Sequence, residues 1–208
     1  MVLTALPSAY LETRYLKFPF KSEKKIEKVL QFELESTIPF DVEEIQIRSQ
    51  LLEGEGVAPL KKESLVMAMA YRRNAIKQLE GELKKFQLSN PAITTQILAL
   101  SSLKQAVEEP TMYGIFDMGH SKTDFLLLSR SAGILGTKTF WWGGKNLLQA
   151  IQDELQIDEE KAEHILSHMD PEKALMRGMQ ASAKTFITEI RQTLKGMINS
   201  GIQLPKPL

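Results

Sequence analysis

The sequence has no cysteine among its 208 residues. This absence excludes disulfide bonds, thiolate metal sites and cysteine nucleophiles, and it is consistent with a reducing compartment. The chain also has no formal net charge, because 26 lysines and arginines balance 26 aspartates and glutamates. Without a long-range electrostatic field, we do not expect the protein to bind nucleic acid.

Long apolar runs are also missing. None approaches the roughly 20 residues that a bilayer span requires. The opening segment MVLTALPSAY has neither the basic head nor the long apolar stretch of a signal peptide. We therefore expect a soluble chain with no direct membrane insertion, and a length that fits one or two domains at roughly 150 residues each.

The first half of the chain predicts the order β-β-α-β-β-α. Ser22 is the predicted N-cap of the first helix, whose apolar residues recur at helical spacing. Alternating or continuous apolar runs predict the strands, and Pro and Gly mark their ends. The predicted strands cover 2–7, 13–20, 42–53 and 64–70, and the predicted helices cover 22–36 and 71–88.

The second half predicts a short helix over 94–106, a β-meander and then helices. The meander strands cover 112–116, 125–128 and 134–142, and helices follow over 146–155, over 158–169 and near the C-terminus. Asp158 is the predicted cap of the penultimate helix. Trp141 and Trp142 are adjacent on a strand and so point to opposite faces; we expect both to be covered, with the more exposed ring as a contact residue.

The turn DMGHSKTDF, residues 117–125, is the most distinctive polar segment. Asp117, His120 and Ser121 supply the side chains of a hydrolase triad, but residues this close on one turn cannot easily align as nucleophile, base and orienter. A metal site is also not favoured, since the other histidines, His164 and His168, form a remote pair on a helix.

Phosphate binding fits this turn better. Gly119, Ser121 and Thr123 can aim backbone N–H groups and hydroxyls at an anion, and Asp117 can hold a hydrated magnesium ion. An ordinary tight turn, with glycine at positive φ, carries about equal weight. Lys122 is expected to be solvated.

Longer segments add a family resemblance. DMGHSKTDFLLL resembles the second phosphate hairpin of actin-like ATPases, and TKTFWWGGKNLLQAI resembles the strand, double glycine and helix that follow it. LPSAYLETRYLKFPF and KKIEKVLQFELESTIPFDVEEIQI resemble the small inserted subdomain of the GspL/PilM family. The wording of KIEKVLQFELE is more similar to the type II secretion platform protein GspL than to the type IV pilus protein PilM.

This resemblance covers nearly the whole chain and implies a fold. It implies an α/β fold with α+β parts, namely a partial actin-like ATPase (ribonuclease H-like) fold with a small inserted β-β-α subdomain. Residues 1–108 would hold that subdomain and the remainder of the first large subdomain, and residues 109–208 the second large subdomain. The first phosphate motif and the adenosine segment of such ATPases have no counterpart here, so we expect a middle fragment.

The resemblance also implies a function. We expect a scaffold rather than an enzyme, with Asp117, Gly119, Ser121 and Thr123 as an inherited hairpin, no metal, and ATP with magnesium bound only by a complete parent fold. The expected place is the cytoplasmic side of the inner membrane, and the expected partners are the secretion ATPase GspE, GspM and further GspL copies. The alternative is a PilM-like pilus protein that binds ATP and a PilN-type peptide. The candidate partner contacts are Phe18, Phe20, Phe32, Phe40, Ile45 and Trp142.

Overall fold

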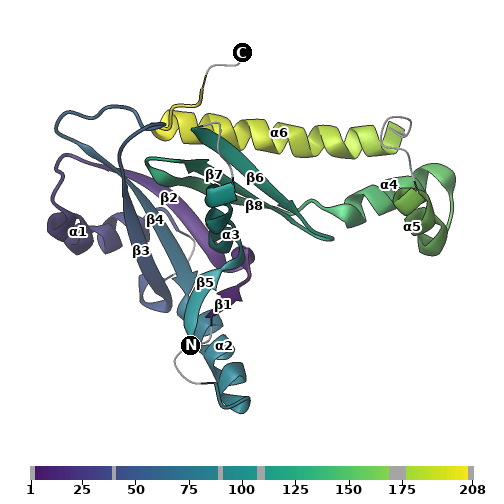
Figure 1. The fold of residues 1–208 in the computed structure, drawn as a ribbon, viewed down its shortest axis with the longest axis horizontal. Helices are drawn as coiled ribbons and strands as arrows, with labels where there is room; N and C mark the ends of the chain where they lie inside the picture. Colours follow the sequence, from purple (N-terminus) through teal and green to yellow (C-terminus); the bar gives the residue numbers. More distant parts are fainter. Residues whose placement is uncertain (1–2, 39–40, 89–90, 107–110, 169–176, 206–208) are drawn as a thin grey trace. The chain divides into compact units, whose positions relative to one another are not determined.

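The computed structural model describes residues 3–38, 41–88, 91–106, 111–168 and 177–205 (Figure 1). The chain divides into two compact units. The first holds residues 1–115, 126–138 and 197–208, and the second holds residues 116–125 and 139–196. These units are defined by contacts within the chain and do not correspond to the subdomains of a parent fold. The predicted subdomain boundary at residue 108 therefore stays a prediction.

A three-stranded antiparallel sheet forms the centre of the first unit (Figure 1). Its order is β2-β4-β3, with β2 at Leu11–Phe18, β4 at Ser64–Arg72 and β3 at Ile45–Leu52. The middle strand β4 is buried continuously from Ser64 to Ala70, because strands flank it on both edges and side chains cover both of its faces. The predicted strands over 13–20, 42–53 and 64–70 are therefore confirmed within a few residues.

Helix α1, Glu23–Glu35, covers one face of this sheet. Ile26, Leu30 and Leu34 recur every four residues and are buried against Val66 and Ala68 of β4. Ser22 is the N-cap, as predicted, but its side chain makes no capping bond. Its backbone carbonyl instead accepts hydrogen bonds from the first turn.

A second, two-stranded sheet in the same unit was only half predicted. Strand β1, Leu3–Leu6, pairs in parallel with β5, Ala92–Thr95. The predicted helix over 94–106 was wrong at its start, because Thr94 and Thr95 belong to β5. The helical part is short, with α3 at Gln96–Ala99 and the 3₁₀ segment η3 at Leu100–Ala106. Two more 3₁₀ turns lie at Ser8–Tyr10 (η1) and Val42–Glu44 (η2). Helix α2, Arg73–Lys85, follows β4 directly.

The predicted meander is present as a sheet of order β6-β7-β8. Its strands are β6 at Met112–Met118, β7 at Thr123–Ser129 and β8 at Gly133–Phe140. Three helices follow: α4 at Gly144–Leu155, α5 at Glu159–His168 and α6 at Arg177–Ser200. Asp158 caps α5, as predicted, by accepting a hydrogen bond of 2.9 Å from the Lys161 backbone. In the part of the chain that is described, no helix has the length and apolar character to cross a membrane.

Candidate functional site

The tip of the β6–β7 hairpin, residues 117–123, includes the adjoining ends of both strands and lies in the second unit. The Gly119 N–H closes the turn by donating to the Lys122 carbonyl at 2.9 Å. Asp117 and Gly119 are exposed, Ser121 is half-buried and Thr123 is fully buried. The alternative of an ordinary tight turn with Gly119 at positive φ is not found, because Gly119 is not among the residues with left-handed backbone.

The Thr123 hydroxyl is used inside the protein. Its side chain has 0 % exposure, and Oγ1 donates to the backbone carbonyl of Trp142 at 2.7 Å. A buried hydroxyl that already donates cannot turn toward an external anion without losing this bond. Among the four predicted phosphate contacts, Thr123 therefore has a structural role in this chain.

The first N–H groups of α4 are also occupied. Helix N-termini bind anions through free N–H groups. Here the Gly144 N–H donates to the Gly119 carbonyl at 3.0 Å, and the Lys145 N–H donates to the His120 carbonyl at 2.8 Å. The Asn146 side chain accepts from the Gly143 N–H at 2.9 Å. The hairpin tip thus fills the anion-binding position of the helix with its own carbonyl oxygens.

Gly143 makes this contact possible. A Cβ atom at Gly143 would lie 2.5 Å from the Gly119 oxygen and 2.7 Å from the His120 oxygen. The backbone there is extended, with φ of −169°, which any residue can adopt. Glycine is therefore needed because a larger side chain would collide with these oxygens, and not because of its backbone conformation. The sequence predicted only that Gly143 and Gly144 end the strand.

A buried charge pair supports the start of β7. Asp124 has 2 % exposure, and its carboxylate accepts from Lys122 Nζ at 2.8 Å and from Thr139 Oγ1 at 2.7 Å. The expectation that Lys122 is solvated was wrong, since its side chain is only 22 % exposed. The signal in the sequence was the spacing of Lys122 and Asp124, because residues two apart on a strand share a face.

The histidines do not take part in a metal-binding cluster in the described residues. His120 is exposed at the tip, and the rings of His164 and His168 lie 4.2 Å apart on the exposed side of α5. Across the described residues, no three histidine, aspartate or glutamate side chains gather in a metal-binding arrangement.

The predicted partner contacts separate into core and surface residues. Phe18 and Ile45 have 4 % and 1 % exposure and belong to the core beneath α1, whereas Phe32 is 73 % exposed on α1. Phe20 is half-buried, with its ring 5.7 Å from that of Phe18. Phe40 lies outside the described residues.

Trp142 and Trp141 have opposite environments. Trp142 has 9 % exposure, stacks on Phe186 with ring centroids 4.3 Å apart, and donates from Nε1 to Ser182 Oγ at 2.9 Å. Little of this ring is left for a partner. Trp141 is 69 % exposed, so the expectation that both tryptophans would be covered was wrong.

The first unit contains a separate pocket of about 340 Å³ on the face of β3 and β4 that is opposite α1. Met69 and Tyr71 of β4 and Gln46 and Arg48 of β3 line it, together with residues of α2 and β5. Burial raises the pKa of Tyr71, and a hydrogen bond with Thr95 opposes this rise. Sequence reasoning did not find this β3–β4 pocket, because its lining comes from separate elements.

Solved structures identify the class of fold. The chain is similar, with a TM-score of 0.69 and 22 % identity, to a structure described as the PilM-PilN type IV pilus biogenesis complex; the match covers 93 % of this chain and 57 % of that one. This chain therefore spans less than two thirds of that relative. The fold is a partial actin-like ATPase fold, as predicted.

The family follows from the sequence match. The model described as type IV pilus assembly protein PilM matches residues 2–203, and the chain belongs to this family. A second similar structure is the cytoplasmic domain of EpsL, an inner-membrane component of the type II secretion system of Vibrio cholerae, with a TM-score of 0.47, 16 % identity and coverage of 76 % of this chain and 57 % of that one. No curated protein matches the chain. The preference for GspL over PilM thus has only weak support.

Proposed function

We propose that this protein is a non-catalytic scaffold in a type IV pilus or type II secretion assembly platform, at the cytoplasmic face of the inner membrane. The family match over residues 2–203 is the observation that carries this proposal. The similar PilM structure is a complex with PilN, which favours a PilN-type partner for this chain as well. The secretion ATPase GspE, GspM and further GspL copies remain proposed partners of the GspL-like alternative.

The hairpin tip supports a non-catalytic role. Phosphoryl transfer depends on positioned donors around the phosphates. Here Thr123 donates to a backbone carbonyl, and the Gly144 and Lys145 N–H groups donate to the tip itself. These groups stabilise the fold and are not free to bind a nucleotide.

Nucleotide binding can be tested directly by calorimetric titration with ATP and magnesium. We expect no heat of binding in the micromolar range. Asp117→Ala is the matched variant, because Asp117 is exposed and its replacement should leave the fold intact. Micromolar binding that disappears in Asp117→Ala would favour the second candidate, a PilM-like protein that binds ATP together with a peptide.

Protein binding can be tested by capture on the immobilised chain. The two baits are a PilN-type cytoplasmic peptide and the N-terminal region of a secretion ATPase. We expect the chain to retain at least one of the two baits. If that bait binds the small subdomain, replacing residues 13–60 should abolish its capture. Retention of neither bait by the intact chain would contradict the scaffold proposal.

A further inference from the structure

One edge of β3 has no strand partner in the described part of the first unit. In the sheet order β2-β4-β3, β3 pairs with β4 on one side, and no other described strand pairs with it. The strand is eight residues long, Ile45–Leu52. An unprotected edge of this length offers a row of backbone donors and acceptors to another chain.

A groove runs between this edge and α1. Two cavities of about 390 Å³ and 160 Å³ share Glu27 of α1 and Ser49 of β3, so they are neighbouring stretches of one groove. We call this surface the α1–β3 groove. Alternate residues of β3 line it, namely Ile45, Ile47, Ser49 and Leu51.

The lining of the groove is mainly polar, with an apolar part on β3 that is only partly covered. Ile45 is buried, whereas Ile47 and Leu51 are half-buried beside the core. Removing their remaining apolar surface from water would favour an added strand with apolar side chains on the same face.

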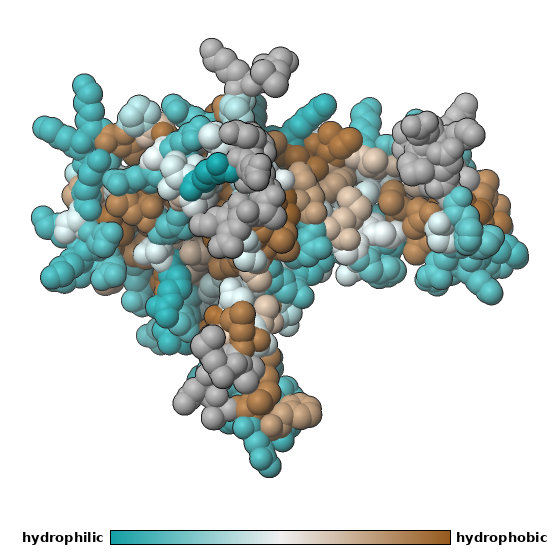
Figure 2. Space-filling model, in the orientation of Figure 1, coloured by the Kyte–Doolittle hydropathy of each residue, from teal (hydrophilic) through white to brown (hydrophobic). Residues whose placement is uncertain are grey.

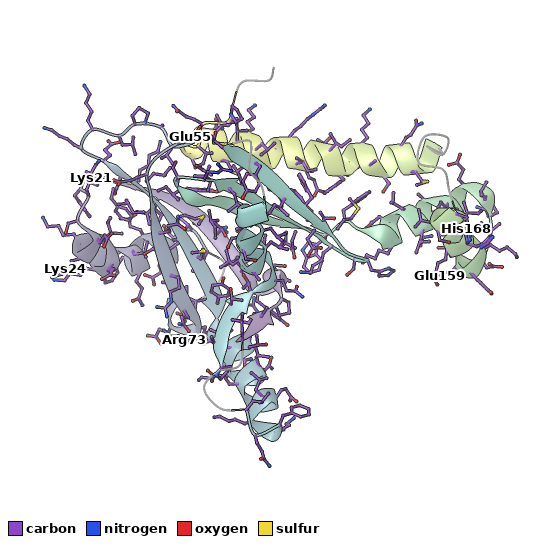
Figure 3. The ribbon with its side chains drawn as sticks, viewed as in Figure 1. Lys21, Lys24, Glu55, Arg73, Glu159 and His168 are labelled. Carbon is purple, nitrogen blue, oxygen red and sulfur yellow. The ribbon has the colours of Figure 1, made fainter. Side chains whose placement is uncertain are left out.

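The two ends of the groove have opposite charge. Glu23 and Glu27 lie one helical turn apart on α1; Glu23 lines the stretch that reaches Leu51, and Glu27 lines both stretches. Among the described residues neither glutamate forms an ion pair. Arg73 lies at the Ile45 end, where its Nε donates to the Ile45 carbonyl at 2.7 Å (Figure 3). The surface over the rest of α1 is mainly hydrophilic (Figure 2).

We propose that the α1–β3 groove binds an extended segment of another protein, which pairs with β3 as a fourth strand. This inference deepens the proposed scaffold function and rests on it. The segment carries apolar side chains toward Ile47 and Leu51, an acidic side chain at Arg73, and a basic side chain at Glu23 and Glu27. At about 3.3 Å per residue, roughly seven residues fill the groove.

A second copy of this chain is a poorer occupant. Arg48 lies in the middle of β3. In the antiparallel registers with the greatest overlap, Arg48 of one copy would lie opposite or diagonal to Arg48 of the other, which is unfavourable. A charge in the middle of an edge strand is a common device against self-pairing.

The binding test uses fluorescent synthetic peptides of about seven residues. Probe A has valines at the positions that face the groove, glutamate at one end and lysine at the other; probe B has glutamate at both ends. We expect probe A to bind at least tenfold more tightly than probe B. The double variant Glu23→Lys, Glu27→Lys should reverse this preference. Failure of probe A to bind the unmodified chain at about 1 mM would overturn the proposal.

Blocking the groove provides the structural control. Ser49 is exposed and lines both cavities, so Ser49→Trp should fill the groove and weaken probe A at least tenfold. Ser36→Trp, at the exposed C-cap of α1, should leave binding unchanged. Equal binding of probe A by Ser49→Trp and the unmodified chain would refute the location.

Backbone methylation tests strand pairing. N-methylation of alternate amides in probe A removes hydrogen-bond donors that strand addition requires, so affinity should fall at least tenfold. Unchanged affinity would show that the occupant is not a strand. Light scattering tests self-association. If the unmodified chain is a dimer and Ser49→Trp is a monomer, a second copy occupies the groove and the proposal is overturned.

The same variant distinguishes this inference from the proposed function. Platform baits captured equally by the unmodified chain and by Ser49→Trp would exclude the α1–β3 groove and leave the scaffold proposal intact. Probe A binding without capture of any bait would support the groove and contradict the proposed partners.

Discussion

The hairpin tip at residues 117–123 and the edge of β3 differ in how they use their polar groups. The tip has the more recognisable sequence, yet its hydroxyl, its helix N–H groups and its neighbouring charges bond within the protein. The β3 edge has no motif, yet it leaves backbone groups, half-buried apolar side chains and exposed charges available. A motif thus indicates ancestry, whereas availability for binding depends on which contacts the fold has already made.

The largest expected effect on the free energy of unfolding comes from comparing the buried ring of Trp142 with the exposed ring of Phe32 on α1. Trp142→Ala should lower the free energy of unfolding by about 3–5 kcal/mol, because it removes a buried ring that stacks on Phe186 and bonds to Ser182. Phe32→Ala, on the exposed face of α1, should change it by no more than about 0.5 kcal/mol. Urea denaturation measures both, and similar losses would break the comparison.

Gly143→Ala tests the close approach of the tip to α4. The new Cβ would meet two carbonyl oxygens, so we expect a loss of about 1–3 kcal/mol in unfolding free energy. Gly81→Ala is the control: apart from the neighbouring residues and backbone of α2 itself, nothing lies within 4 Å of the added Cβ, so this variant should gain about 0.5–1 kcal/mol. A neutral Gly143→Ala would mean that the tip is not held against the helix.

Lys122→Met tests the buried charge pair. Removing the ammonium takes a charged hydrogen-bond donor away from the buried Asp124 carboxylate, so the unfolding free energy should fall by about 1–3 kcal/mol. Lys24→Met, on the outer surface of α1, is the solvated counterpart and should be nearly neutral (Figure 3). Equal losses of unfolding free energy in the two variants would indicate that Lys122 is solvated, as the sequence predicted.

The smallest effect on stability concerns Tyr15 of β2. Like the Thr123 hydroxyl in the second unit, the Tyr15 hydroxyl in the first unit donates to a backbone carbonyl of the protein. Its hydroxyl donates to the Leu135 carbonyl at 2.8 Å, so Tyr15→Phe should cost about 0.5–1.5 kcal/mol. Burial raises the pKa of Tyr15 in the folded state. The folded protein therefore favours the neutral phenol, and its stability should fall as pH rises above about 10, the unfolded pKa. Denaturation midpoints between pH 8 and 11 should fall less in Tyr15→Phe than in the unmodified chain.

Much of the fold could be predicted from local pattern. Helix α1 has a regular apolar face, β4 is a continuous apolar run, and Asp158 caps α5 in the predicted way. Strand β5 was missed, because its pairing partner Leu3–Leu6 lies far away in sequence and four residues with two threonines carry little periodicity.

The candidate site was harder to predict than the fold. The sequence placed Asp117, Gly119, Ser121 and Thr123 on one turn, but it did not show that Thr123 would be buried or that Lys122 would pair with Asp124. It also did not distinguish Trp141 from Trp142, because strand β8 ends at Phe140 and both tryptophans lie beyond the predicted strand's true end.

The sequence by itself determined the family, the order of most elements and the position of the hairpin. These depend on local residue patterns and on motifs that can be recognised in the amino-acid sequence. Only the tertiary structure decided which polar groups remain available, because a hydrogen bond between Thr123 and Trp142, or a free edge at β3, depends on which distant segments meet.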